Sequence, residues 1–116
     1  MKTAENAWLW LAKILAGWAL LILLGIHFIV NHLAAPAGLL TYADVVHYYQ
    51  VPGIVLMEAL FLMMVVSHAL LGLRSILLDL RPSVPVLRFV DIALSGLGIA
   101  AIVYGLWLLL LIRSRA

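Results

Sequence analysis

VPGIVLMEALFLMMVVSHALLGL, residues 51–73, is an almost uninterrupted apolar stretch in which Glu58 is the only acidic side chain. Two similar stretches flank it in the chain, at residues 14–35 and 92–112, and neither contains a formally charged residue. An α-helix needs roughly 20 consecutive apolar residues to cross the hydrocarbon core of a bilayer. The three stretches therefore predict an all-α membrane protein with three transmembrane helices.

The amino-acid composition agrees with this prediction. Of the 116 residues, 67% are hydrophobic and 10% are charged, whereas a soluble domain is about half apolar and about a quarter charged. Too few polar side chains are present to cover a water-facing surface, so the bilayer must act as the solvent and lipid is a partner. We expect a single transmembrane domain over residues 1–116, with spans at about 8–35, 50–77 and 88–112.

The sequence also excludes several classes of function. Cysteine is absent, which rules out disulfides, thiolate zinc sites and iron–sulfur ligation within this chain. The net charge of +2 comes mostly from arginines near the ends of apolar stretches, and it does not indicate a nucleic-acid partner. The chain has no dinucleotide-binding fingerprint and no sizeable soluble domain, so we expect no complete redox enzyme within it.

The distribution of basic residues predicts the orientation in the membrane. The connection between the first two spans, residues 36–50, contains no lysine or arginine, while the next connection contains three arginines. Basic residues concentrate on the cytoplasmic side of membrane proteins. We therefore expect a multi-pass protein of the inner (cytoplasmic) membrane with a cytoplasmic N-terminus, although the two C-terminal arginines run against this rule. The residues that support this orientation are Lys2, Lys13, Arg74, Arg81 and Arg88.

Shorter features mark the ends of the spans. The segment YADVVHYYQ, residues 42–50, predicts a short interfacial helix. Pro52 suits the first turn of the second span, where a missing N–H costs nothing. Asp91 is expected in the first turn of the third span.

The stretch SHALLGLRSILLDL, residues 67–80, carries polar groups at helical spacing. His68, Gly72, Ser75 and Asp79 stand at i, i+4, i+7 and i+11, so they share one face of a helix. Ionisable groups inside a span are costly and indicate a functional site by default. An imidazole one turn before a glycine can reach a metal while a flat macrocycle lies against the bare backbone.

Haem b fits that description, because it takes axial imidazoles in an apolar slot between helices and needs cations near its propionates. Arg74 can supply such a cation. A simpler alternative stays open from spacing alone. His68 can hydrogen-bond to a neighbouring helix, and glycine is ordinary where helices touch. Ser75 and Asp79 can also mark the helix end near water.

The pattern His-x-x-x-Gly-x-Arg-x-x-x-x-Asp, formed by His68, Gly72, Arg74 and Asp79, resembles the second transmembrane helix of the small anchor subunits of succinate dehydrogenase. These are the cytochrome b subunits of respiratory complex II, and the resemblance extends over essentially the whole chain. It implies that His68 is an axial ligand of haem b iron. It further implies that the chain forms half of a haem-binding bundle, with a second anchor subunit donating the other imidazole.

The resemblance also implies the remaining partners. A flavoprotein subunit and an iron–sulfur subunit would sit on the cytoplasmic face, and electrons from succinate would reach a quinone near the haem. The chain would act in the enzyme only as a subunit, with no succinate-oxidising site of its own.

Two departures from the family pattern bear on the subunit type. C-type subunits usually carry Ser-x-x-x-Arg before the first span, and residues 4–18 lack it. D-type subunits often have a tyrosine after the motif aspartate, where this chain has Leu80. The missing first element favours a D-type assignment, while Arg74 is more typical of the C-type. Candidates for quinone contact, chosen by position only, are Trp8, Trp10, Ser75 and Asp79.

His27, in the first span, is too far from His68 to share its iron. Counted from the cytoplasmic ends of the predicted spans, His27 lies about 20 Å deep and His68 about 8 Å deep at 1.5 Å per residue. Two imidazole nitrogens on one iron lie only about 4 Å apart. The second ligand should therefore come from another chain.

Glu58 lies about 22 Å deep on the same scale, level with His27. We favour a structural polar pair between Glu58 and either His27 or Asn31 that joins the first two spans. The functional alternative is a protonatable relay, or a second, outer haem ligated by His27.

Two other functions compete with a haem-bearing anchor. A small multidrug-type transporter is suggested by the chain length and the intramembrane Glu58, but such proteins usually have four spans with the acid in the first. A haem-free fumarate reductase anchor subunit is the other alternative, and it would have no use for His68.

Overall fold

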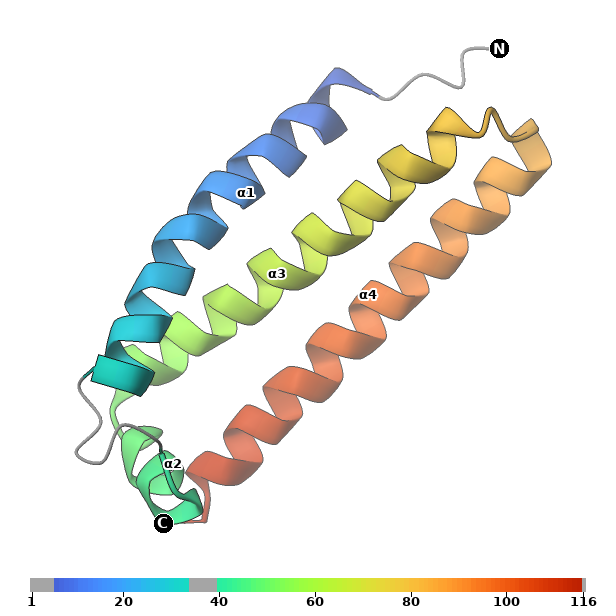
Figure 1. The fold of residues 1–116 in the computed structure, drawn as a ribbon. Coiled ribbons are helices and arrows are strands. Elements are labelled where there is room, and N and C mark those ends of the chain that lie inside the picture. Colours follow the sequence, from blue (N-terminus) through green and yellow to red (C-terminus); the bar gives the residue numbers. More distant parts are fainter. Residues whose placement is uncertain (1–5, 34–39, 116) are drawn as a thin grey trace.

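The computed structural model describes residues 6–33 and 40–115. Helix α1 (Ala7–Phe28) continues into a π-helical turn, η1 (Ile29–Leu33). A short helix α2 (Tyr42–Tyr48) precedes two long helices, α3 (Pro52–Asp79) and α4 (Val84–Arg113). Three segments are long and apolar enough to cross a membrane: Ala7–Leu33, Pro52–Asp79 and Val84–Arg113. This agrees with the predicted all-helical architecture of three spans (Figure 1).

Local sequence signals explain where the helices begin. Pro52 opens α3 as expected. Thr41 caps α2 through a reciprocal pair of bonds, in which its hydroxyl accepts from the Asp44 N–H at 3.3 Å and its own N–H donates to the Asp44 carboxylate at 2.8 Å. These bonds from Thr41 lower the pKa of Asp44. The predicted interfacial helix is therefore present.

The helix that contains the third span starts four residues before the predicted span limit at about residue 88. Helix α4 begins at Val84, with Pro85 in its first turn, where a missing N–H is tolerated. Asp91 consequently lies about two turns inside the helix rather than in its first turn, so that expectation was wrong. The first span was predicted to end at residue 35, which lies outside the described residues.

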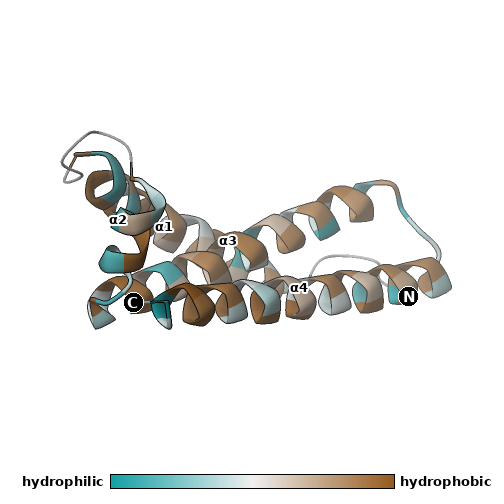
Figure 2. Cartoon of the chain, turned by 90° about the horizontal axis from the view of Figure 1, so that it is seen from below, coloured by the Kyte–Doolittle hydropathy of each residue, from teal (hydrophilic) through white to brown (hydrophobic). Residues whose placement is uncertain are grey.

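Helix α3 occupies the middle of the molecule, with α1 against one side and α4 against the other (Figure 1). Hydrophobic residues cover most of the three long helices, and hydrophilic residues gather mainly near their ends and around α2 (Figure 2). Among the described residues, the buried hydrophobic side chains are Ala16, Leu78 and Leu109. The large apolar surface that remains is suited to lipid and to other chains.

Glycines allow α3 and α4 to approach closely. A Cβ atom built on Gly98 would lie 2.7 Å from Cδ1 of Leu70. One built on Gly105 would lie 2.5 Å from Cδ2, 3.0 Å from Cδ1 and 3.3 Å from Cγ of Leu62. Without a hydrophobic driving force between helices in lipid, such close packing supplies much of the association energy.

We predict that Gly105→Ala destabilises the α3–α4 contact by about 1–3 kcal/mol, because the new methyl crowds three side-chain atoms of Leu62, which must shift to make room. Gly96→Ala on the same helix is the matched control, since a Cβ there meets nothing within 4 Å. Heat-induced unfolding of the purified protein in detergent measures both. Equal unfolding temperatures for the two variants would contradict the proposed packing.

Candidate functional site

His68 points from α3 toward α1. Its Nδ1 atom lies 3.3 Å from the backbone carbonyl oxygen of Lys13. A Cβ atom built on Gly17, one turn further along α1, would lie 3.2 Å from Cε1 of the same ring. Because a carbonyl only accepts hydrogen bonds, this contact requires the proton on Nδ1. The imidazole then keeps a lone pair on Nε2, for which residues 6–33 and 40–115 provide no hydrogen-bond partner.

An apolar groove of about 460 Å³ runs along α1 beside this ring. Its wall combines apolar side chains with the half-buried imidazole. A Cβ built on Gly72, one turn after His68 on α3, would meet nothing within 4 Å. A nitrogen lone pair, an apolar groove and open space at Gly72 together fit a flat, iron-bearing macrocycle. The residues that line the groove are Lys13, Ile14, Gly17, Trp18, Leu20, Leu21, Leu24 and His68.

Ser75 lies two turns beyond His68 and is tied to the same part of α1. The Nζ of Lys13 donates to Oγ of Ser75 at 2.8 Å, and Ser75 donates in turn to the carbonyl of Leu71 at 3.1 Å. Lys13 thus contacts α3 through both its carbonyl and its ammonium group. It places a cation on the face of α3 that carries His68.

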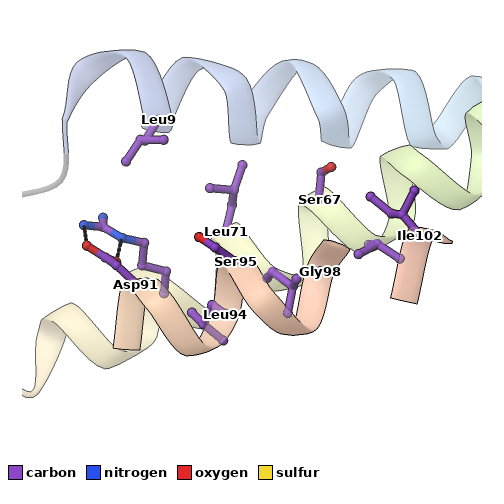
Figure 3. A pocket seen from close by; sticks show the side chains of 11 residues that line it. Leu9, Ser67, Leu71, Asp91, Leu94, Ser95, Gly98 and Ile102 are labelled. Atoms are coloured by element: carbon purple, nitrogen blue, oxygen red, sulfur yellow. Dashed lines mark hydrogen bonds and ion pairs between the residues drawn. The ribbon is translucent and has the colours of Figure 1, made fainter. Parts of the chain in front are cut away.

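Arg74 reaches from α3 to α4. Its Nε donates to Oδ1 of Asp91 at 2.6 Å and its Nη2 to Oδ2 at 3.3 Å, forming a two-pronged ion pair with α4. The pair closes one end of a cavity of about 380 Å³ between α1, α3 and α4 (Figure 3). Arg74 was expected to supply a cation for haem propionates, whereas its ion pair is with Asp91 of α4.

The remaining candidates lie near the same end of the molecule. Asp79 is the last residue of α3 and is exposed. Trp8 and Trp10, in the first turn of α1, are 76% and 52% exposed. The structure brings His68 and Ser75 together against α1, but it does not bring Arg74, Asp79 or the two tryptophans into contact with them.

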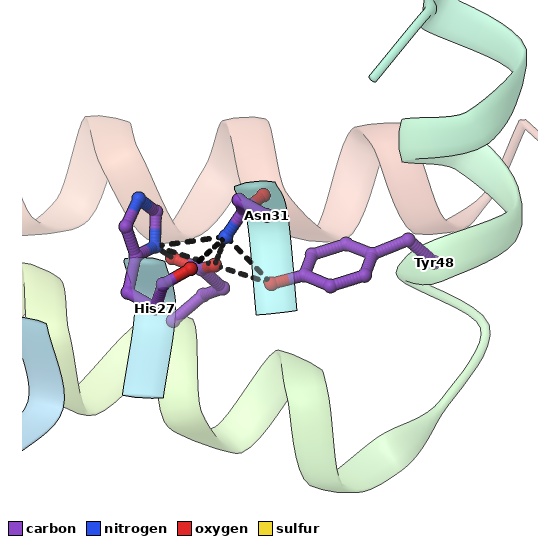
Figure 4. A network of polar contacts seen from close by, with 4 residues as sticks. His27, Asn31 and Tyr48 are labelled. Carbon is purple, nitrogen blue, oxygen red and sulfur yellow. Dashed lines mark hydrogen bonds and ion pairs between the residues drawn. The ribbon is translucent and has the colours of Figure 1, made fainter. Parts of the chain in front are cut away.

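A second polar cluster lies near the other end of the molecule, around the buried Glu58 (Figure 4). Nδ1 of His27 lies 2.9 Å from Oε1 and 3.1 Å from Oε2 of this carboxyl group. The amide of Asn31 donates to the His27 carbonyl at 2.8 Å and to Oε1 of Glu58 at 3.4 Å. The His27 ring stacks on Phe61, with centroids 4.9 Å apart. The predicted polar pair joining the first two spans is therefore confirmed.

Tyr48 completes this cluster and was missed in the sequence. Its hydroxyl donates to Oε1 of Glu58 at 2.7 Å and accepts from Asn31 at 3.1 Å. Burial, and secondly the hydrogen bond to Glu58, raise the pKa of Tyr48, so the phenol keeps its proton. The sequence shows only that Tyr48 is close to Glu58 along the chain. A tyrosine at that place is equally well explained as part of the belt of aromatic residues at a membrane interface.

The two histidines lie at different levels of the α1–α3 contact. His68 meets α1 at Lys13 and Gly17, whereas His27 meets α3 at Glu58. Ten residues of α3 separate His68 from Glu58, which corresponds to about 15 Å along the helix. One iron cannot bind both imidazoles, as expected from the sequence.

Comparisons with known proteins give two matches. The family model described as "Succinate dehydrogenase/Fumarate reductase transmembrane subunit" matches residues 1–88. The succinate dehydrogenase hydrophobic membrane anchor subunit of Archaeoglobus fulgidus is 34% identical over 100 residues, which cover 86% of this chain and 85% of the relative. No solved structure matches the chain.

We predict that Tyr48→Phe destabilises the folded protein by about 1–2 kcal/mol, because a buried carboxyl group loses a hydrogen-bond donor without a change in packing. Tyr42→Phe on the same short helix is the matched control, since that ring is 70% exposed. Thermal unfolding in detergent compares the two. If both variants unfold at the wild-type temperature, the hydrogen bond to Glu58 does not stabilise the α2 end of the molecule.

Proposed function

The chain belongs to the family of succinate dehydrogenase/fumarate reductase transmembrane subunits, and on this premise we propose that it carries haem b through His68. As a member of this family it is a multi-pass membrane protein and a hydrophobic membrane anchor subunit of the succinate dehydrogenase/fumarate reductase complex. Family membership also disfavours the small multidrug-type transporter considered from the sequence.

The observation that carries the proposal is the contact between the His68 ring and the backbone of α1. Its Nδ1 is directed at the Lys13 carbonyl, which leaves Nε2 as the nitrogen available to a metal. Ligating histidines commonly donate their other ring N–H to a carbonyl or carboxylate in this way. Beside it lies the apolar groove along α1, and a Cβ built on Gly72 would meet nothing within 4 Å.

Bound haem b would supply a one-electron carrier between the soluble subunits and quinone. The chain's own residues would bind and orient it. The Lys13 carbonyl would hold the imidazole in one tautomer, and the Lys13 ammonium donates to Ser75 on the same face of α3. Arg74 contacts Asp91 on the α4 side, so its contacts do not support the expected role of a cation for the haem propionates.

The second axial imidazole would come from a partner subunit. His27 lies at another level and is held by Glu58 and Asn31. We infer a second anchor subunit of C-type, which makes this chain the D-type subunit. Together with an iron–sulfur subunit and a flavoprotein subunit, these chains would form the complete complex.

We also propose the orientation and the quinone site from these residues. Trp8, Trp10, Ser75 and Asp79 all lie toward the end of the molecule where α1 begins and α3 ends. With the N-terminus in the cytoplasm, this end would meet the soluble subunits. Quinone would then be bound near that face, beside the haem.

We predict that His68→Ala removes the b-type α band from the reduced-minus-oxidised spectrum of the purified complex, because no other imidazole of this chain lies at that level. His47→Ala is the control, since His47 is exposed on α2 and should leave the spectrum unchanged. An unchanged spectrum in His68→Ala, or a wild-type complex without haem, would overturn the proposal. The latter result would leave a haem-free anchor of the same family.

We predict that His27→Ala keeps at least one six-coordinate, low-spin b haem, because the Glu58 cluster lies about 15 Å from the level of His68. Absorption and electron paramagnetic resonance (EPR) spectra of the assembled complex provide the measurement. Loss of every haem signal while all subunits remain assembled would contradict the assignment of His68 as the sole ligand from this chain.

A further inference from the structure

We propose that Gly17 is a positioning residue for the His68 ligand, and this inference rests on the proposed function. Because Gly17 has no side chain, the imidazole would pack directly against the backbone of α1, with its Nδ1–H toward the Lys13 carbonyl. The role of Gly17 would be to set the distance between ring and helix, and through it the basicity of the nitrogen that binds iron.

The contacts of Gly17 are specific to this ring. A Cβ built there would meet Cε1 of His68 at 3.2 Å and Nδ1 at 3.5 Å, and beyond the adjoining backbone of α1 itself no third heavy atom of the described residues lies within 4 Å. Nδ1 is the atom that donates to the Lys13 carbonyl, at an Nδ1–O distance of 3.3 Å, and Cε1 is bonded directly to it. A methyl group at residue 17 would therefore push the imidazole away from α1 and lengthen that bond.

The other close glycines differ in what they face. Gly98 and Gly105 lie against leucine side chains, where a small shift changes packing and nothing else. At Gly17 the neighbour is a ring with one nitrogen bonded to the helix and the other available to a metal. A displacement of a few tenths of an ångström here would alter the chemistry of the ligand as well as its packing.

The hydrogen bond to Lys13 should change the reduction potential of the haem in a predictable direction. Donation of Nδ1–H to a carbonyl raises the basicity of the other ring nitrogen. A more basic axial ligand stabilises ferric iron and lowers the reduction potential of the haem. Weakening the bond to Lys13 should therefore favour ferrous iron and raise the potential.

The test compares Gly17→Ala with Gly25→Ala in the complete complex. The same methyl group is added to the same helix in each variant, but a Cβ at Gly25 meets nothing within 4 Å. We expect Gly17→Ala to keep its haem and to shift the ferrous-to-ferric ratio at a fixed potential upward by about threefold to tenfold, or ~28 to ~59 mV for a one-electron couple. We also expect its low-spin EPR signal to move, because that signal depends on the relative orientation of the two axial rings.

Each outcome has a distinct meaning. If Gly17→Ala and Gly25→Ala share the wild-type potential and EPR signal, or if the Gly17→Ala potential falls, the positioning role is overturned while haem ligation by His68 stands. If the wild-type complex contains no haem, the proposed function fails first. A merely structural role for Gly17 would lower the unfolding temperature without moving the potential.

A measurement on the wild-type complex covers the case in which Gly17→Ala does not assemble. Pulsed EPR detects the remote nitrogen of an axial imidazole and reports how strongly its N–H is hydrogen-bonded. Selective isotopic labelling of this chain assigns the signal to this subunit. We expect the remote nitrogen of His68 to show donation to a carbonyl, and a signal typical of an N–H without an acceptor would overturn the inference.

Discussion

The contact between α1 and α3 is the constraint on which both polar sites depend. Near one end of it, Lys13 reaches His68 through its carbonyl and Ser75 through its ammonium group. Near the other end, His27 and Asn31 reach Glu58. An unsatisfied polar group in an apolar environment is costly, so these bonds fix both the rotation and the height of α1 against α3. The open groove beside His68 exists because that rotation turns the imidazole toward α1.

Helix α3 separates two kinds of chemistry on its two sides. The side toward α1 carries Glu58, Ser75 and the candidate metal ligand His68. The side toward α4 carries the ion pair of Arg74 with Asp91, together with close packing at Gly98 and Gly105. Because an arginine paired in this way is already neutralised, its charge acts locally on the α3–α4 contact. On the side toward α1, the Lys13 ammonium group donates to Ser75, two turns beyond His68.

The sequence predicts the number of spans, the short interfacial helix and the shared level of His27 and Glu58, since these follow from composition, capping and the rise per residue. It does not reveal that Tyr48 reaches Glu58 or that Arg74 pairs with Asp91. Both contacts depend on how helices rotate about their axes and how α2 folds back, and the apolar residues around every helix leave that rotation undetermined. For the same reason, the contact between Gly17 and His68 could not be predicted, because the sequence around a glycine in a span does not indicate which side chain faces it.

The scarcity of buried side chains has a consequence for the life of the subunit in the cell. A chain whose apolar surface is largely open has little internal core to hold it together, so that surface needs lipid or other subunits to cover it, and binding to such subunits would stabilise the fold. A copy inserted into the membrane without those subunits would be a ready substrate for quality-control proteases. Its abundance would then follow the supply of its companions rather than its own rate of synthesis.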